Sequence, residues 1–159
     1  MERKALMRAM KNSISEVLET MFFLPVDFSD TVDAEELWHL EEIKMSVTKL
    51  DFSGPFSGSF VLFIPEEFAV SLTADFLGKD EEKVSEDNVI ETSKEVINMI
   101  AGSTFANLDD QAVFDLNIPE NILFEQAAHF SGTEDDIFVQ VITLDNYFVL
   151  KMVIGQGTL

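Results

Sequence analysis

Apolar residues recur every three or four positions in two long segments, and this periodicity constrains the fold more strongly than any other feature of the sequence. The segment 5–23 predicts a helix that ends before Pro25. A second long helix is expected at about residues 87–107, with Ser85 and Asn88 as candidates for its N-terminal cap. The apolar stripe of the first helix consists of Leu6, Met10, Ile14, Val17, Leu18 and Met21.

Strand patterns lie between the two helices. Residues 42–64 first alternate between apolar and polar side chains, then pass through FSGPFSGS into the apolar run FVLFI. This pattern is typical of two strands joined by a glycine-rich turn. A helix of about three turns should follow, because Pro65 suits a helix start and Gly78 suits a C-terminal cap.

The second half of the chain resembles the first in its order of elements. After the second long helix we expect a short extended piece around Phe114, a corner at Pro119, and strands near residues 136–144 and 147–154. The helices also share a short sequence match, EVLETMFF at 16–23 and EVINMIAG at 95–102. Two halves related by a pseudo-twofold axis would explain both observations.

Length and composition limit the class of protein. The 159 residues are 47% hydrophobic, which suits one domain spanning residues 1–159. The mixed order of helices and strands leads us to expect an α+β fold with long helices packed on a mostly antiparallel sheet. The formal net charge of −20 argues against binding to nucleic acid or to an anionic membrane. With no cysteine, no signal-peptide pattern and no apolar run long enough to span a bilayer, a cytoplasmic location is the simplest interpretation.

One face of the second helix carries polar residues with a suggestive spacing. At about 100° per residue, its apolar side chains gather on one side, while Glu91, Glu95, Asn98 and Gly102 lie on the other. Glu95 and Asn98 are neighbours at i and i+3, beside a glycine that would let another backbone approach. Exposed glutamate and asparagine usually form nothing more than a solvated helix face, so the spacing alone does not assign a function.

Other chemistries have weaker support. His39 and His129 are the only histidines, and neither stands in a spacing that forms a metal site with nearby acids. The acidic loops KDEEKVSED and GTEDD lack the alternating ligands and central glycine of a calcium loop. Trp38, Phe22 and Phe23 are expected to pack in the core.

Two stretches of the chain resemble a known family. SKEVINMIAGSTFANL at 93–108 and FSGPFSGSFVLFIPEEFAVSLTADFLG at 52–78 resemble the CheX branch of the CheC, CheX and FliY chemotaxis phosphatases. That family has an Asp or Ser, then a Glu four residues later, an Asn three residues after that, and a more distant Pro. Glu95, Asn98 and Pro119 match this pattern. Glu91 replaces the Asp or Ser, and the spacing to Pro119 is slightly short.

The resemblance implies a CheC-like fold and a protein phosphatase that hydrolyses the aspartyl phosphate of a CheY-type response regulator. It implies that Asn98 and Glu95 are the catalytic residues: Asn98 would position the attacking water, and Glu95 would pair with the regulator's active-site lysine. Glu91, Met99 and Gly102 are the expected partner contacts. The magnesium ion would belong to the regulator, so this chain would need no cofactor of its own.

Two alternatives remain open at this point. The chain could be a receiver-binding module or flagellar-switch component that docks without hydrolysis, or a homodimer whose helix face is merely surface. The first helix keeps Glu16 but has Glu19 where a second asparagine would stand, which implies one active motif per chain. The sequence does not identify the regulator or show whether a CheD-like protein controls the activity.

Overall fold

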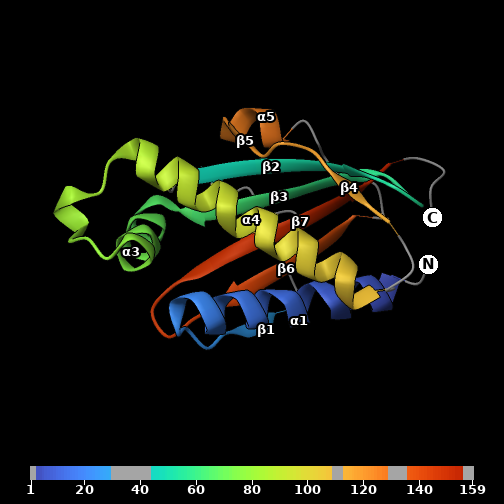
Figure 1. The fold of residues 1–159 in the computed structure, drawn as a ribbon, viewed down its shortest axis with the longest axis horizontal. Coiled ribbons are helices and arrows are strands. Elements are labelled where there is room, and N and C mark those ends of the chain that lie inside the picture. The colour runs from blue at the N-terminus through green and yellow to red at the C-terminus, as the bar shows by residue number, and fades with distance from the viewer. Residues whose placement is uncertain (1–2, 30–43, 109–112, 129–135, 156–159) are drawn as a thin grey trace.

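The computed structural model describes residues 3–29, 44–108, 113–128 and 136–155. Within these ranges, two long helices and a shorter one lie across a sheet, and a further short helix sits near one edge (Figure 1). The helices are α1 (Arg3–Phe22), α3 (Glu66–Leu77), α4 (Glu86–Leu108) and α5 (Phe124–Ala128), with a 3-10 turn η2 (Glu81–Lys83). The strands are β1 (Asp27–Ser29), β2 (Met45–Ser53), β3 (Gly58–Pro65), β4 (Asp115–Leu116), β5 (Glu120–Ile122), β6 (Ile137–Ile142) and β7 (Tyr147–Ile154).

The sheet is antiparallel at every pairing among the described strands, and its order is β1-β6-β7-β3-β2-β4, with β5 also paired to β2. The hairpins β2–β3 and β6–β7 meet at the central β3–β7 ladder. After α1, strand β1 joins the hairpin of the second half, and after α4, strands β4 and β5 join the hairpin of the first half. This exchange has the order that a pseudo-twofold axis requires, and the expected α+β fold is confirmed.

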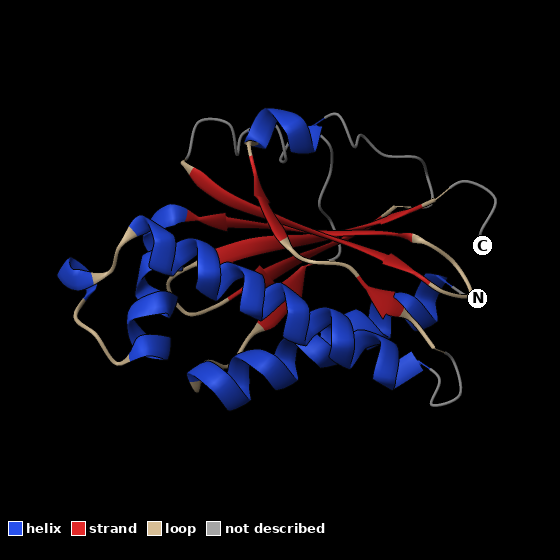
Figure 2. Ribbon diagram, turned by 45° about the horizontal axis from the view of Figure 1, so that its top comes forward, coloured by secondary structure: helices blue, strands red, loops and turns tan. Residues whose placement is uncertain are grey.

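Alternation along the strands explains why the sheet is covered on both faces. In β3, Phe60 and Leu62 belong to the large core beneath the helices, whereas Val61 and Phe63 belong to a smaller apolar cluster on the opposite face. The Phe63 ring lies 5.9 Å from the ring of Phe124 in α5. Figure 2 shows α1, α3 and α4 together on one side of the sheet. The run FVLFI is therefore apolar at every position because both of its faces are buried.

Helices α1 and α4 run antiparallel and are joined by polar contacts. Ser103 Oγ donates to Glu16 Oε2 at 3.3 Å, and Asn107 Nδ2 donates to Ser13 Oγ at 3.1 Å. Beneath these contacts, the apolar stripe of α1 is buried against the sheet as predicted, except that Met21 in the last turn is 39% exposed. The side chains fully buried along this stripe are Leu6, Met10, Ile14 and Leu18.

The end of α1 differs from expectation. Helix α1 does stop before Pro25, but Phe23 adopts a left-handed conformation with φ of 53°. Its N–H donates to the Glu19 carbonyl at 3.2 Å, and the Leu24 N–H donates to the Leu18 carbonyl at 3.1 Å. This conformation turns the Phe23 side chain out to 87% exposure, whereas Phe22 is buried as predicted. The expectation that Phe23 packs in the core is wrong: it rested on the residue type alone, and the left-handed backbone turns this side chain into solvent.

We predict that Phe23→Gly stabilises the protein. A non-glycine residue in the left-handed region costs about 1–2 kcal/mol, partly offset here by the larger unfolded-state entropy of glycine. The free energy of unfolding, measured by urea denaturation, should rise by about 0.5–1 kcal/mol.

The matched control is Gly78→Ala at the C-terminal cap of α3. Gly78 has φ of 65°, and a Cβ there would meet no atom within 4 Å. The substitution therefore measures only the cost of placing a non-glycine residue in the left-handed region. It should lower the free energy of unfolding by about 1 kcal/mol. A destabilised Phe23→Gly protein would mean that the exposed ring makes contacts that outweigh the backbone cost.

Candidate functional site

The candidate site lies on α4, whose start is fixed by a reciprocal cap. The Asn88 N–H donates to Ser85 Oγ at 3.0 Å, and the Ser85 N–H donates to Asn88 Oδ1 at 3.1 Å. This is the arrangement of a capping box, with asparagine in the place of the usual glutamate or glutamine. The predicted capping residues are confirmed, and the cap satisfies backbone N–H groups at the start of the helix that carries the site.

The two faces of α4 divide as the periodicity predicts. The outward face, which we call the α4 crest, consists of Glu91, Glu95, Asn98 and Gly102, and all four are exposed. The buried face includes Val89, Val96, Ile97, Ile100 and Ala101. Because the apolar face is occupied by the core, the crest is held on a rigid element with its side chains free to meet another molecule.

Glu95 and Asn98 lie at the two opposite edges of this crest, which we call its shoulders. At about 100° per residue, Glu95 lies on the shoulder nearer Ser103 and therefore nearer α1. Asn98 lies on the shoulder nearer Phe105, whose ring stacks on Phe114 at 3.9 Å between centroids. Within the part of the chain that the structure describes, no hydrogen bond or ion pair engages either side chain. The amide of Asn98 and the carboxylate of Glu95 are thus available to an external partner.

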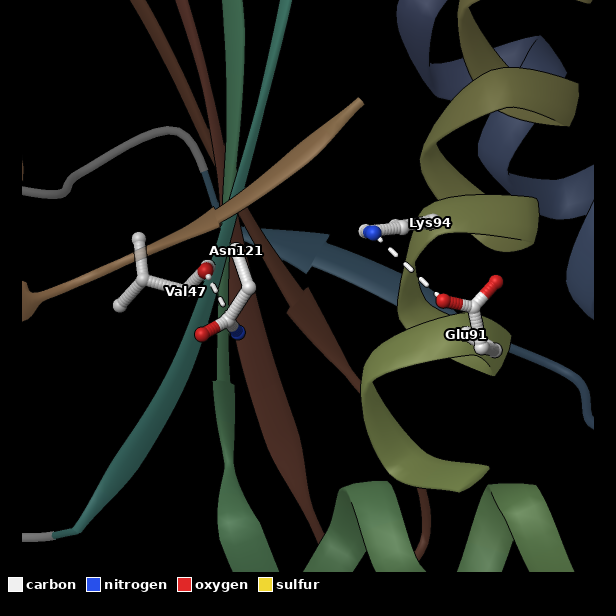
Figure 3. A network of polar contacts seen from close by, with 4 residues as sticks. All are labelled: Val47, Glu91, Lys94 and Asn121. Carbon is white, nitrogen blue, oxygen red and sulfur yellow. Dashed lines mark hydrogen bonds and ion pairs between the residues drawn. The ribbon is translucent and has the colours of Figure 1, made fainter. Parts of the chain in front are cut away.

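The expected partner contacts have different environments. Glu91 is exposed but paired, since the Lys94 ammonium lies 3.5 Å from Glu91 Oε1 (Figure 3). Met99 is half-buried and packs against the core, so it offers a partner less surface than Glu91 or Gly102. A Cβ added at Gly102 would meet no atom within 4 Å, so nothing in the described fold requires a glycine there.

Lys94 was not predicted as a site residue, although its spacing from Glu91 was visible in the sequence. An opposite charge at i and i+3 is a common helix pair, and Glu91 with Lys94 has that spacing. Figure 3 shows the Lys94 side chain leaving α4 toward the strand that carries Asn121. That strand is held to β2 by its ladder and by the Asn121 amide, which donates to the Val47 carbonyl at 3.2 Å.

The equivalent face of α1 carries Asn12, Glu16 and Glu19, all exposed. Unlike Glu95, the Glu16 carboxylate is used within the chain, where it accepts the hydrogen bond from Ser103. Pro119 lies half-buried between β4 and β5, two strands that both contact α4. The two long helices are therefore similar in position but different in what their outward residues can do.

Among the residues that the structure describes, the one shifted pKa lies on the other face of the sheet. Burial lowers the pKa of Lys151, and the Asp136 carboxylate 3.6 Å away opposes this change. The ammonium also lies 5.1 Å from the centroid of the Phe138 ring. This pair belongs to the side of the sheet opposite α4, so it takes no part in the candidate site.

The described residues give no support to a metal site in this chain. Across residues 3–29, 44–108, 113–128 and 136–155, no group of three or more His, Asp or Glu side chains is placed to hold an ion. His39 and His129, as well as Trp38, lie outside these ranges. None of the helices described is both long enough and apolar enough to cross a bilayer.

The family model for the chemotaxis phosphatase CheX matches residues 47–142. A search of curated protein sequences found no match. The solved structures that share the fold at low sequence identity include the following three.

The first is CheX from Borrelia burgdorferi in a complex described as CheX-CheY-BeF3-Mg+2. It has a TM-score of 0.74 and 19% identity, and covers 95% of this chain and 98% of its own. CheX from Vibrio vulnificus has a TM-score of 0.73 and 15% identity, and covers 98% and 99%. FliY from Thermotoga maritima is less similar, with a TM-score of 0.58, 11% identity, and coverage of 94% and 86%.

The match to the family model contains most of the sheet and the whole of α4 with its crest. Because their identities to this chain are below 20%, the three solved structures show a shared fold and nothing more. The family model, however, spans more than half of the chain, and this protein therefore belongs to the CheX family of chemotaxis phosphatases.

Proposed function

We propose that this protein hydrolyses the aspartyl phosphate of a CheY-type response regulator, with Asn98 and Glu95 as its catalytic residues. The observation that carries the proposal is the α4 crest, where both side chains stand exposed and without a partner among the described residues. Membership of the CheX family supports the reaction class. The Borrelia CheX structure, described as a complex with CheY, BeF3 and magnesium, supports the class of partner.

The chemistry suits an amide better than an acid. In the reaction, the oxygen of a water molecule forms a bond to phosphorus while the bond between phosphorus and the aspartyl oxygen breaks. The aspartate leaves as a carboxylate, and inorganic phosphate retains the elements of water. Because such transfer needs positioning more than covalent help, the Asn98 amide would act by accepting a hydrogen bond from the water and holding it in line.

Glu95 has a different role in this proposal. A carboxylate brought directly to the phosphoryl group would be repelled by its negative charge, so Glu95 would instead pair with a cationic side chain of the receiver, its active-site lysine. The shoulder position of Glu95, one turn from Asn98, lets the two side chains meet different groups at once. The magnesium ion would be supplied by the receiver, so this chain would need no cofactor of its own.

The second candidate function is docking without hydrolysis, as a receiver-binding module or flagellar-switch component. The exposed α4 crest suits docking as well as it suits hydrolysis. Both candidates place the receiver on the α4 crest, and only turnover separates them. One active motif per chain, a single domain and a cytoplasmic location complete the proposal, while the homodimer remains an alternative that gel filtration would test.

We predict that Asn98→Ala lowers catalysed phosphate release from a phosphorylated receiver by on the order of a hundredfold, as the loss of one positioning group can do. Asn12→Ala is the matched control, because Asn12 is an exposed helical asparagine on the equivalent face of α1. It should leave turnover unchanged. A folded Asn98→Ala protein with wild-type turnover would remove Asn98 from the catalytic machinery.

We predict that Glu95→Lys weakens association with the phosphorylated receiver by at least tenfold, because it sets two cations against each other. Glu125→Lys makes the same change in net charge on α5, across the sheet from α4, and should alter affinity little. Titration of the receiver against each variant gives the dissociation constants. Equal affinities for Glu95→Lys and the wild type would show that Glu95 is not an anchor.

We predict opposite effects of Gly102→Ala on stability and on binding. Glycine in a helix interior costs about 1 kcal/mol relative to alanine, and the added Cβ meets nothing, so the free energy of unfolding should rise by about that amount. If the receiver approaches the crest closely at this point, affinity should fall by about tenfold, since overpacking costs about 1–3 kcal/mol. A stabilised variant with unchanged affinity would show that nothing docks against Gly102.

A further inference from the structure

The Glu91–Lys94 pair is poorly explained as a device for stability. Lys94 is the one basic residue of α4, and its side chain is 31% exposed against 75% for Glu91. Solvent-exposed helix pairs at this spacing contribute only about 0.3–0.5 kcal/mol. The ammonium and carboxylate are 3.5 Å apart, at the long end of the range for a hydrogen bond. An interaction this weak is easily exchanged for another.

Lys94 stands beside the catalytic amide of the proposed function. It precedes Asn98 by four residues, so the two side chains are neighbours along one shoulder of α4. That shoulder faces the segment carrying Phe114, which stacks on Phe105. Figure 3 shows the Lys94 side chain extending from α4 toward the strand that carries Asn121, with Glu91 next to it. In the structure the ammonium pairs with Glu91, on the N-terminal side of Lys94, and a change of lysine rotamer would turn it along the helix toward Asn98.

The charges around Asn98 create a need for a cation. Glu91 and Glu95 both lie on the α4 crest, in a chain whose net charge is −20. A phosphorylated receiver brings further negative charge, and docking removes the water that screens these groups from one another. An ammonium within one turn of Asn98 would offset this repulsion where it is strongest. Lys94 is the one residue of α4 with that charge.

We propose that Lys94 binds an anionic group of the docked receiver, either a phosphoryl oxygen or a carboxylate beside it, and that Glu91 is a positioning residue that holds Lys94 ready. This rests on the proposed function, because the receiver is the partner. Docking would replace a weak, solvated ion pair with a charge-assisted hydrogen bond in an interface from which water is excluded. The substitution needs no movement of the α4 backbone, only a change of lysine rotamer.

A charge swap separates this proposal from a purely structural role. The double variant Glu91→Lys/Lys94→Glu keeps an i,i+3 ion pair, but moves the ammonium about 4.5 Å along the helix, away from Asn98. Lys94→Gln removes the charge and keeps most of the stem. Lys44→Gln is the control, since it also removes one positive charge, from an exposed ion pair with Glu66 outside α4.

The experiment measures kcat and KM for phosphate release from a phosphorylated CheY-type receiver. It also measures dissociation constants for the unphosphorylated receiver and for its complex with beryllofluoride and magnesium. Lys94→Gln should lower kcat/KM by about tenfold, the value of one exchanged charge-assisted contact. Glu91→Gln should change it by less than about threefold, Lys44→Gln should not change it, and the charge swap should not restore the activity lost in Lys94→Gln.

The binding data identify the anion. Loss of affinity confined to the beryllofluoride form supports contact with the phosphoryl group, and equal loss in both forms supports contact with a receiver carboxylate. The proposal is overturned if Lys94→Gln keeps wild-type affinity and kcat/KM, or if the charge swap restores both. If Asn98→Ala is inactive while Lys94→Gln is fully active, the proposed role of Lys94 is wrong and the proposed hydrolysis stands. A wild-type protein that binds the receiver without releasing phosphate removes the proposed hydrolysis, and the affinities still decide Lys94. A wild-type protein that binds neither form overturns both.

Discussion

The pairing of β3 with β7 is the contact on which the rest of the fold depends. These two strands come from different halves of the chain and pair antiparallel from Gly58 opposite Ile154 to Phe63 opposite Val149. Their side chains toward the helices, among them Phe60 and Leu150, are fully buried. The ladder therefore joins the two hairpins into one sheet and gives α1 and α4 a common apolar surface. Because contacts between such distant segments carry a large loop-closure cost, the apolar burial on both faces has to offset it.

This surface also determines why the two long helices are not equivalent. Both lay their apolar faces on the sheet and turn their polar faces outward, as a pseudo-twofold arrangement requires. The contacts between them are unequal, however. Glu16 is engaged by Ser103, whereas Glu95 at the matching place on α4 is left without a partner among the described residues. One helix thus contributes its outward carboxylate to the joint between the halves, and the other keeps its carboxylate for an external partner.

The sequence was informative where one local rule dominates. Periodicity predicted which face of α4 is buried, and the spacing of Ser85 with Asn88 predicted its cap, because each depends on residues within a few turns. It was silent on the exchange of β1, β4 and β5 between halves, since strands of two or three residues acquire their place from distant partners. It misjudged Phe23, where one left-handed residue breaks the helical period.

For the site itself, the sequence identified the exposed crest, and family resemblance supplied the roles of Glu95 and Asn98. Periodicity could not show that the Met99 side chain is partly buried against the core. Nor could it show that Gly102 has open space around it, because that depends on what lies across from the helix. The link between Glu91 and Lys94 was visible as a spacing, but the direction of the Lys94 side chain, toward the strand that carries Asn121, needed coordinates.

The composition of the crest argues that α4 is not optimised for its own stability. Asparagine and glycine in a helix interior cost about 0.5 and 1 kcal/mol relative to alanine, and at Asn98 and Gly102 no contact within the described fold offsets that cost. Elsewhere the same helix is stabilised by a reciprocal cap, a buried apolar face and an aromatic stack at Phe105. A helix that is stabilised by its cap and its buried face, and weakened at two outward positions, keeps a rigid backbone beneath Asn98 and Gly102, which its own fold does not use. Catalysis by positioning tolerates only small errors in distance, so the amide must stand on a rigid support. A well-stabilised α4 that leaves Asn98 exposed provides that support.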